Sequence, residues 1–247
     1  MTRILVLQHH PLEHPGTFRD FLAADGLPWD AVRLDAGEAI PSLDGYAAMI
    51  VMGGPQDVWQ EERYPWLIAE KAAIREAVVE RRLPYLGICL GHQLLAVALG
   101  GTVAPMPAKA EIGIREVELT AEGGRDPLLG GEGKRLACLQ WHAAEVTALP
   151  EGAVSLARND ASEIQALRWG SNAYGLQFHV EASATTVEDW AGIPAYRQAL
   201  ERGLGEGELA LFAAEAKRRA AALKASAGRL YRHFKDMLAT SGGDRGR

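Results

Sequence analysis

Apolar residues in the first hundred or so positions group into short continuous runs separated by longer mixed segments. Four of these runs predict buried strands: 3–8, 29–34, 46–52 and 84–89. Three segments between and after them are expected to be helical: 17–24, 64–82 and 90–99. Strands that are apolar throughout and alternate with helices predict a parallel sheet with helices on both faces.

The pattern changes after residue 101. Short apolar pieces, separated by turns such as EGGRDP and LPEG, predict five further strands: 113–119, 136–141, 153–157, 163–168 and 174–180. The segment 206–238 is rich in good helix formers and predicts a helix, with a break or kink inside it caused by Gly228. The 247 residues suffice for one sizeable domain, and no linker is long enough to divide the chain.

Composition and charge narrow the range of partners. A formal net charge of −6 argues against nucleic acid, because phosphate binding needs a basic face. Two cysteines are too few for a disulfide scaffold. The apolar run near the N-terminus is too short for a signal peptide or a membrane span. We therefore expect a soluble, cytoplasmic protein with no nucleic acid or membrane partner.

The stretch GICLGHQ, residues 87–93, places Cys89 between two glycines where a predicted strand meets a predicted helix. This pattern is typical of a nucleophile elbow, a turn so tight that side chains at Gly87 and Gly91 would collide. The elbow would present the thiol at the carboxyl end of the sheet. There, the partial positive charge of the next helix favours the reactive thiolate. The alternative is a buried apolar cysteine, as we expect for Cys138.

A thiol nucleophile needs a general base, and the base needs a group that orients it. The stretch YGLQFHVE, residues 174–181, supplies His179 and Glu181. If strand geometry persists to the end of this stretch, side chains two positions apart share a face. Glu181 would then fix the tautomer of the imidazole. The alternative is a solvated pair at a sheet edge, which the elbow cysteine makes the weaker interpretation.

The remaining histidines are weaker candidates. His92 follows the elbow on the next helix, and His142 in LQWHAAE could line a pocket. One loop near the N-terminus holds three more: His9, His10 and His14. Glu13 lies among them, which raises the option of a metal site. Their spacing completes no recognisable ligand pattern, so we expect a solvated loop and no metal.

Attack on an amide carbonyl builds negative charge on its oxygen, and backbone N–H groups must be positioned to stabilise it. One donor would be the N–H of Leu90, the residue after the nucleophile. The run YAAMIVMGGPQ offers a second, because Gly53 and Gly54 follow a buried strand and Pro55 stiffens the turn. The alternative interpretation is an ordinary turn.

In this order along the chain, VMGGPQ, LPYLGICLGHQLLAVALGG and YGLQFHVE resemble class I (triad type) glutamine amidotransferases. The likeness is to the glutaminase domain of GMP synthase and its stand-alone relatives, and it covers about residues 1–190. It implies an α/β, flavodoxin-like, mostly parallel sheet with a smaller antiparallel portion. It also implies hydrolysis of the side-chain amide of L-glutamine without a cofactor. We expect residues 191–247 to form a helical extension packed on the same domain.

The resemblance implies roles for individual residues. Cys89 would attack the amide carbonyl, giving a γ-glutamyl thioester and ammonia. His179 would move the protons, and Glu181 would orient it. Gly54 and Leu90 would hold the oxyanion. Four further residues are expected to contact the substrate: Gly53, Gln93, Trp141 and His142.

Two departures from the family pattern leave alternatives open. Val180 stands where the family usually has a proline, so the loop loses a fixed φ but keeps both catalytic side chains. The chain also carries no signature of the ATP pyrophosphatase domain of GMP synthase, so the ammonia acceptor would be a separate synthetase subunit or water. A γ-glutamyl peptidase acting on γ-glutamyl peptides or conjugates is the alternative enzyme. A non-catalytic flavodoxin-like scaffold or stress protein is the third interpretation.

Overall fold

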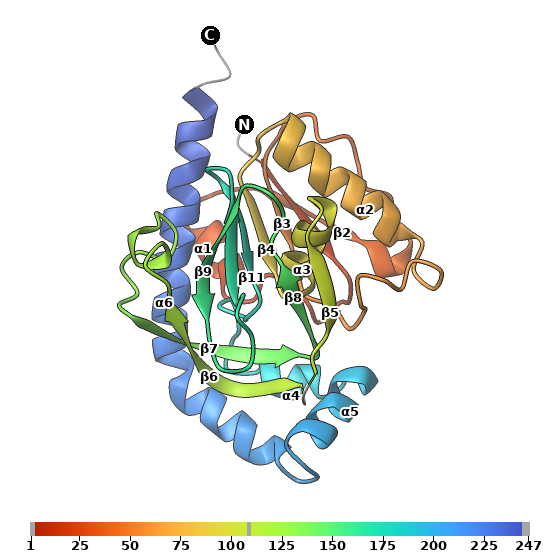
Figure 1. Cartoon of the computed structure of the whole chain (residues 1–247), viewed down its shortest axis with the longest axis vertical. Helices are drawn as coiled ribbons and strands as arrows, with labels where there is room; N and C mark the ends of the chain where they lie inside the picture. The colour runs from red at the N-terminus through yellow and green to blue at the C-terminus, as the bar shows by residue number, and fades with distance from the viewer. Residues whose placement is uncertain (1–2, 108–109, 244–247) are drawn as a thin grey trace.

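A nine-stranded mixed sheet forms the centre of the molecule (Figure 1). The structure, a computed structural model, describes residues 3–107 and 110–243. Five neighbouring strands are parallel: β2 (Trp29–Arg33), β1 (Arg3–Gln8), β3 (Tyr46–Val51), β4 (Tyr85–Ile88) and β11 (Ala173–Leu176). The sheet continues with four antiparallel strands: β10 (Ala166–Trp169), β9 (Ala153–Arg158), β6 (Glu111–Leu119) and β7 (Arg135–His142). Two more strands form a small antiparallel sheet: β5 (Thr102–Pro105) and β8 (Ala144–Ala148).

Helices cover both faces of the parallel half. Along β1 the side chains alternate, so that Ile4 and Val6 enter one buried cluster while Leu5 and Leu7 enter the other. The first cluster is closed by α1 (Phe18–Ala24) and α6 (Leu209–Gly243). The second is closed by α2 (Trp66–Arg75) and α3 (Leu90–Ala98). This two-sided burial explains why β1, β3 and β4 are largely apolar, whereas the edge strand β2 buries only Val32 fully.

A third apolar cluster lies where the antiparallel strands meet the later helices, at the lower end of Figure 1. It joins β6 and β7 to α4 (Thr186–Trp190), α5 (Pro194–Gly203) and the start of α6. Trp141 lies within it, with its ring 5.9 Å from that of Trp190, 5.6 Å from that of Tyr196 and 5.4 Å from that of Phe212. Three short helical turns complete the secondary structure: η1 (Leu34–Ala36), η2 (Glu76–Glu80) and η3 (Gly123–Arg125).

The predicted α/β architecture is confirmed, including the mostly parallel sheet, the antiparallel portion and the helical C-terminal segment. Three details of the prediction are wrong. The helix α6 runs through Gly228 without the expected break, and a Cβ at that position would lie 3.4 Å from the ring of Phe21. The strand expected at 174–180 ends at Leu176, because the chain leaves β11 and His179 forms a single bridge with Leu139. The strands β5 and β8 were not predicted.

The carboxyl ends of four adjacent parallel strands lead into the region described next. His9 follows β1, Gly53 comes shortly after β3, Cys89 follows β4 and Gln177 follows β11. Ligands bind at this edge in open α/β sheets. None of the helices in the described ranges is both long and apolar enough to cross a membrane.

Candidate active site

Cys89 forms a strained turn between β4 and α3. Its φ of 52° is one of two positive values among the described residues that are not glycine. A Cβ at Gly87 would lie 2.3 Å from the carbonyl oxygen of Gly91, and a Cβ at Gly91 would lie 2.2 Å from that of Val51. Both positions therefore require glycine. The N–H of Cys89 donates to the carbonyl of Leu176 at 2.8 Å, which ties the elbow to β11.

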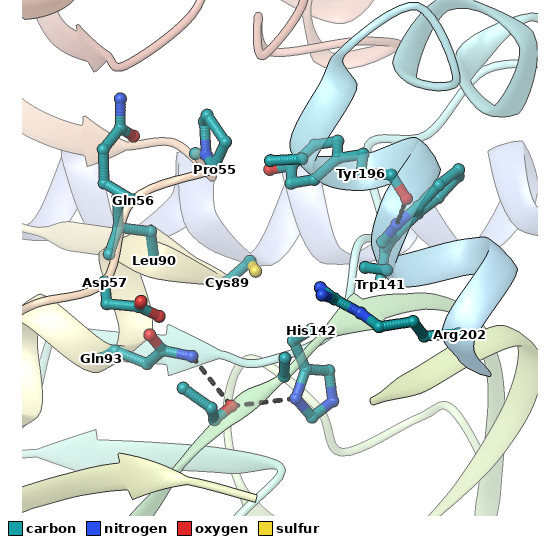
Figure 2. Close-up of a pocket in the computed structure, with 15 residues that line it drawn as sticks. Pro55, Gln56, Asp57, Cys89, Leu90, Gln93, Trp141, His142, Tyr196 and Arg202 are labelled. Atoms are coloured by element: carbon teal, nitrogen blue, oxygen red, sulfur yellow. Dashed lines mark hydrogen bonds between the residues drawn. The ribbon is translucent and has the colours of Figure 1, made fainter. Parts of the chain in front are cut away.

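The thiol of Cys89 faces a pocket of about 180 Å³ (Figure 2). Six residues singled out in the sequence contribute to its lining: Gly54, Cys89, Leu90, Gln93, Trp141 and His142. The pocket also receives side chains from the C-terminal segment, because Tyr196 and Arg202 project into it from α5.

His179 and Glu181 are buried, do not belong to the lining of this pocket, and contact each other. The Nδ1 atom of His179 lies 2.7 Å from Oε1 of Glu181, although the two residues are outside any regular strand. Trp190 packs edge-on against the imidazole with ring centroids 4.5 Å apart. These contacts fix the ring plane and leave its Nε2 atom without a hydrogen-bond partner among the described residues.

The imidazole of His179, whose Nε2 atom is free within the described residues, interacts electrostatically with the thiol of Cys89. Burial alone would lower the pKa of His179, but the charges of Glu181 and Cys89 raise it well above its ordinary value. Gln177 reaches the same sulfur, with its Nε2 atom 3.7 Å from Sγ of Cys89. Hydrogen bonds between a base and its nucleophile are often long until a substrate is bound. The arrangement suits a histidine that exchanges a proton with a thiol.

The loop at Gly53 and Gly54 is held from behind by His9. The Nδ1–H of His9 donates to the carbonyl of Gly53 at 2.8 Å, and its Nε2 atom lies 2.8 Å from Oε1 of Glu70. Because the peptide bond is planar and trans, this contact turns the N–H of Gly54 in the opposite direction. Gly54 lines the pocket, and its N–H makes no hydrogen bond within the described residues. Leu90 begins α3, so its N–H has no partner within that helix.

His9 donates from both of its nitrogens when the ring is charged, and its surroundings favour that charge. Burial lowers the pKa of His9, but the charge of Glu70 together with the hydrogen bonds to Glu70 and to the carbonyl of Gly53 raises it overall. The ring is stacked on Trp66 at 5.4 Å. A buried ion pair therefore fixes the orientation of the peptide between Gly53 and Gly54.

Glu13 is a second buried carboxyl near the histidine of the site. It accepts a hydrogen bond from the hydroxyl of Tyr196, and burial raises its pKa to about 7. A Cβ at Gly53 would lie 2.7 Å from Oε2 of Glu13 and 3.0 Å from Cε1 of His179. Gly53 is therefore needed for close approach rather than for an unusual φ.

The other predicted contact residues have different surroundings. The Nε2 atom of Gln93 donates to the carbonyl of Ala144 and to Oε1 of Gln177, both at 3.0 Å. His142 is held on both ring nitrogens, by the carbonyl of Ala144 at 3.0 Å and by Glu111 at 3.1 Å. The Nε1–H of Trp141 donates to the backbone of α5, at 3.3 Å.

His92 does not line the pocket. It is fully buried, and burial lowers its pKa to about 3, so it is neutral. A Cβ at Gly175 would lie 2.6 Å from its Nδ1 atom, so the ring packs tightly against β11.

The cluster of histidines near the N-terminus is divided among separate contacts. His10 and His14 each accept a backbone N–H two residues further along the chain, at 3.2 and 3.1 Å, while His9 contacts Glu70. Within residues 3–107 and 110–243, no group of three or more His, Cys, Asp or Glu side chains could hold a metal ion.

Several residues around the site carried no functional signal in the sequence. Gln177 could have been found, because it precedes His179 by two positions in the same stretch. Glu70 lies on a helical pattern, where a glutamate ordinarily faces solvent. Tyr196 and Arg202 approach the elbow from more than a hundred positions away, and nothing local indicates that contact.

Comparison with known proteins identifies a family with the same sequence pattern and fold. The family model described as glutamine amidotransferase class-I matches residues 18–189. A crystal structure of a glutamine amidotransferase from Thermotoga maritima superposes with a TM-score of 0.84 at 30% sequence identity, covering 96% of this chain and 98% of that one.

Three curated relatives show the same likeness in sequence. A glutamine amidotransferase-like protein of Salmonella typhimurium is 34% identical over 190 residues, 75% of this chain and 78% of the relative. A glutamine-hydrolyzing GMP synthase subunit from Methanosarcina acetivorans is 38% identical over 145 residues, 57% of this chain and 67% of the relative. Gamma-glutamyl peptidase 5 of Arabidopsis thaliana is 28% identical over 173 residues, 67% of this chain and 68% of the relative.

Proposed function

Because the chain belongs to the class-I glutamine amidotransferase family, we propose that it hydrolyses the side-chain amide of L-glutamine through Cys89, His179 and Glu181. The observation that carries this proposal is the elbow thiol in a pocket, coupled to a buried imidazole whose other nitrogen is 2.7 Å from a carboxylate. This is the nucleophile, base and orienting group that acyl transfer requires.

The reaction would proceed in two halves. His179 takes the thiol proton, Sγ of Cys89 bonds to the amide carbon, and the C–N bond breaks as His179 returns the proton to the nitrogen. Ammonia leaves and a γ-glutamyl thioester remains. Water, deprotonated by His179, then attacks the thioester, the C–S bond breaks, and glutamate is released with the thiol restored. Glu181 keeps the imidazole in the tautomer that both steps need.

The N–H groups of Gly54 and Leu90 would bind the negative oxygen that forms in each half-reaction. Support comes from the position of both residues in the lining of the pocket and from the His9 contact that orients the Gly54 peptide. We assign Gly53, Gln93, Trp141 and His142 to the substrate's surroundings. Residues 191–247 would belong to the same domain as a helical extension.

The relatives that are named as separate glutamine-hydrolyzing subunits of GMP synthase suggest how the ammonia is used. We propose that this chain, too, delivers ammonia to a separate synthetase subunit. A second candidate is γ-glutamyl peptidase activity, supported by the similarity to gamma-glutamyl peptidase 5. Both activities use the same thioester and differ only in the leaving group.

The test is to incubate the purified protein with L-glutamine and with γ-glutamyl dipeptides and to measure glutamate and ammonia. Cys89→Ala should be inactive on every substrate, and Cys138→Ala, which alters the other buried cysteine, should keep the wild-type rate. Ammonia from glutamine supports the amidotransferase, and glutamate from dipeptides alone supports the peptidase. A wild type that equals Cys89→Ala on all substrates, with and without a co-purifying synthetase, would leave only the non-catalytic scaffold.

A further inference from the structure

Two opposite charges lie on different walls of the pocket around Cys89. Among the described residues of the lining, Asp57 is the only acidic one and Arg202 is the only lysine or arginine. Asp57 comes from the loop after Gly54, and Arg202 comes from the last turn of α5. Figure 2 shows both side chains directed into the pocket, with the sulfur of Cys89 between them in this view.

The carboxylate of Asp57 is half-buried without any compensating contact. It has no ion pair and no hydrogen bond within the described residues, and burial raises its pKa. Its backbone is nevertheless fixed, because the N–H of Asp57 donates to the side chain of Gln60 at 3.0 Å. A partly desolvated carboxylate that faces a pocket from a fixed backbone is suited to binding a cation.

The guanidinium of Arg202 is also unpaired among the described residues, while the helix that carries it is anchored. Tyr196 and Leu200 of α5 are buried in the third apolar cluster. Arg197, on the same helix, donates to the carbonyl of Ala191 at 3.0 Å, whereas Arg202 reaches over the pocket instead. A guanidinium presents a planar set of donors that matches a carboxylate.

We propose that Asp57 and Arg202 select the amino acid end of the substrate, with Asp57 binding the α-ammonium group and Arg202 the α-carboxylate. This assignment rests on the proposed function, because it places the γ-carbonyl at Cys89. Within the described residues the two side chains form no ion pair with each other, so both charges are available to a zwitterion in the pocket. The pocket is otherwise lined by uncharged groups and by His142, whose two ring nitrogens are already engaged.

The assignment defines a class of substrates. L-Glutamine and γ-glutamyl amides keep both α-groups free, and both should bind. A glutamine residue inside an α-linked peptide has lost both charges, and the enzyme should reject it, because the half-buried carboxylate of Asp57 would be covered without a cation to pair with.

Substrate analogues that lack one α-group separate the two contacts. 4-Aminobutanamide is glutamine without the carboxylate, and 4-carbamoylbutanoate is glutamine without the ammonium group. On L-glutamine, kcat/KM should fall by about 10- to 100-fold in Arg202→Met and in Asp57→Asn, since each loses a charged hydrogen bond. On 4-aminobutanamide, Arg202→Met should have the same kcat/KM as the wild type. On 4-carbamoylbutanoate, Asp57→Asn should have the same kcat/KM as the wild type.

Matched control variants remove one guanidinium and one carboxylate that lie outside this pocket. Arg218→Met and Asp160→Asn change exposed residues and should match the wild type on all three substrates. Arg202→Lys should recover part of the activity on L-glutamine, because the charge returns without the planar donor set. A wild type that hydrolyses glutamine, with variants that lose equally on whole and truncated substrates, would overturn the assignment but leave the proposed function intact.

If turnover needs a partner protein, labelling of Cys89 provides the same test. The diazoketone analogue 6-diazo-5-oxo-L-norleucine carries both α-groups and alkylates a thiol with loss of dinitrogen, whereas iodoacetamide carries neither group. Arg202→Met and Asp57→Asn should slow labelling by the diazoketone and leave the iodoacetamide rate unchanged, as followed by peptide mass spectrometry. Equal slowing with both reagents would overturn the assignment. A wild type whose Cys89 is neither labelled by the diazoketone nor active on glutamine would overturn the proposed function with it.

Discussion

Two buried histidine–glutamate pairs lie beside the loop at Gly53, and they differ in whether one or both ring nitrogens have a hydrogen-bond partner. His9 contacts Glu70 through one nitrogen and the carbonyl of Gly53 through the other, both at 2.8 Å. His179 contacts Glu181 at 2.7 Å, and its second nitrogen has no hydrogen bond within the described residues.

This difference determines whether a histidine can only orient its neighbours or can also transfer a proton. An imidazole with both nitrogens engaged can orient its neighbours but has no free site for a proton. An imidazole with one free nitrogen beside a thiol can accept and return a proton during a reaction. The two pairs are alike in burial but not in sequence spacing, and the free nitrogen of His179 is what suits that pair to proton transfer.

Replacing His179 should have the largest effect. In His179→Gln no group near Cys89 can take the thiol proton, so kcat/KM for glutamine should fall by roughly 10⁴-fold or more. Steady-state release of glutamate measures this loss, and unchanged circular dichroism would exclude unfolding. Retention of more than a tenth of the wild-type activity would show that another residue acts as the base.

Glu181→Gln should rank second. The amide can still contact Nδ1 of His179, but it no longer stabilises the charged ring or enforces one tautomer. We expect kcat to fall by roughly 10²- to 10⁴-fold with a smaller change in KM. Glu188→Gln, which changes a glutamate whose side chain is half exposed, is the control and should match the wild type. An unchanged kcat in Glu181→Gln would mean that Trp190 alone orients the ring.

His9→Phe should have a moderate effect. Phenylalanine preserves a ring against Trp66 but removes the donor to Gly53, so the peptide that carries the Gly54 N–H is no longer fixed. Loss of one oxyanion donor costs about 10²- to 10³-fold in kcat, and misorientation should cost less, about 10- to 100-fold. His9→Phe should be combined with Glu70→Leu, so that no buried carboxylate is left without a partner. If the pair of changes lowered stability without lowering kcat, the loop would be held by other contacts.

The smallest effect concerns stability at Glu13. Its folded pKa of about 7 exceeds the unfolded value of 4.5, so the folded protein binds this proton more tightly. The associated stability is present below the unfolded pKa and is lost as the pH rises through about 7. Between pH 5 and pH 8 the wild type should lose roughly 2 to 3 kcal/mol relative to Glu13→Gln, measured by urea unfolding. Parallel pH profiles for the two proteins would contradict this.

The predictable part of the structure rests on local rules. The glycines around Cys89 could be interpreted because a tight turn leaves no room for side chains, and the apolar runs indicated strands buried on both faces. Gly228 led to the wrong prediction of a helix break. A glycine inside a helix destabilises it by about 1 kcal/mol, which is small compared with the free energy that α6 gains by packing on the sheet. The approach of Arg202 to the pocket depends on how α5 packs against Trp141, and no local pattern contains that information.

The most direct test of the account follows the two imidazoles by nitrogen-15 NMR in histidine-labelled protein, with and without the thiol. Cys89 is among the causes of the raised pKa of His179 and is not among the main causes of the raised pKa of His9. Cys89→Ala should therefore lower the pKa of His179 and leave the pKa of His9 unchanged. A His179 titration that is identical in the two proteins would contradict the proposal that His179 exchanges its proton with Cys89.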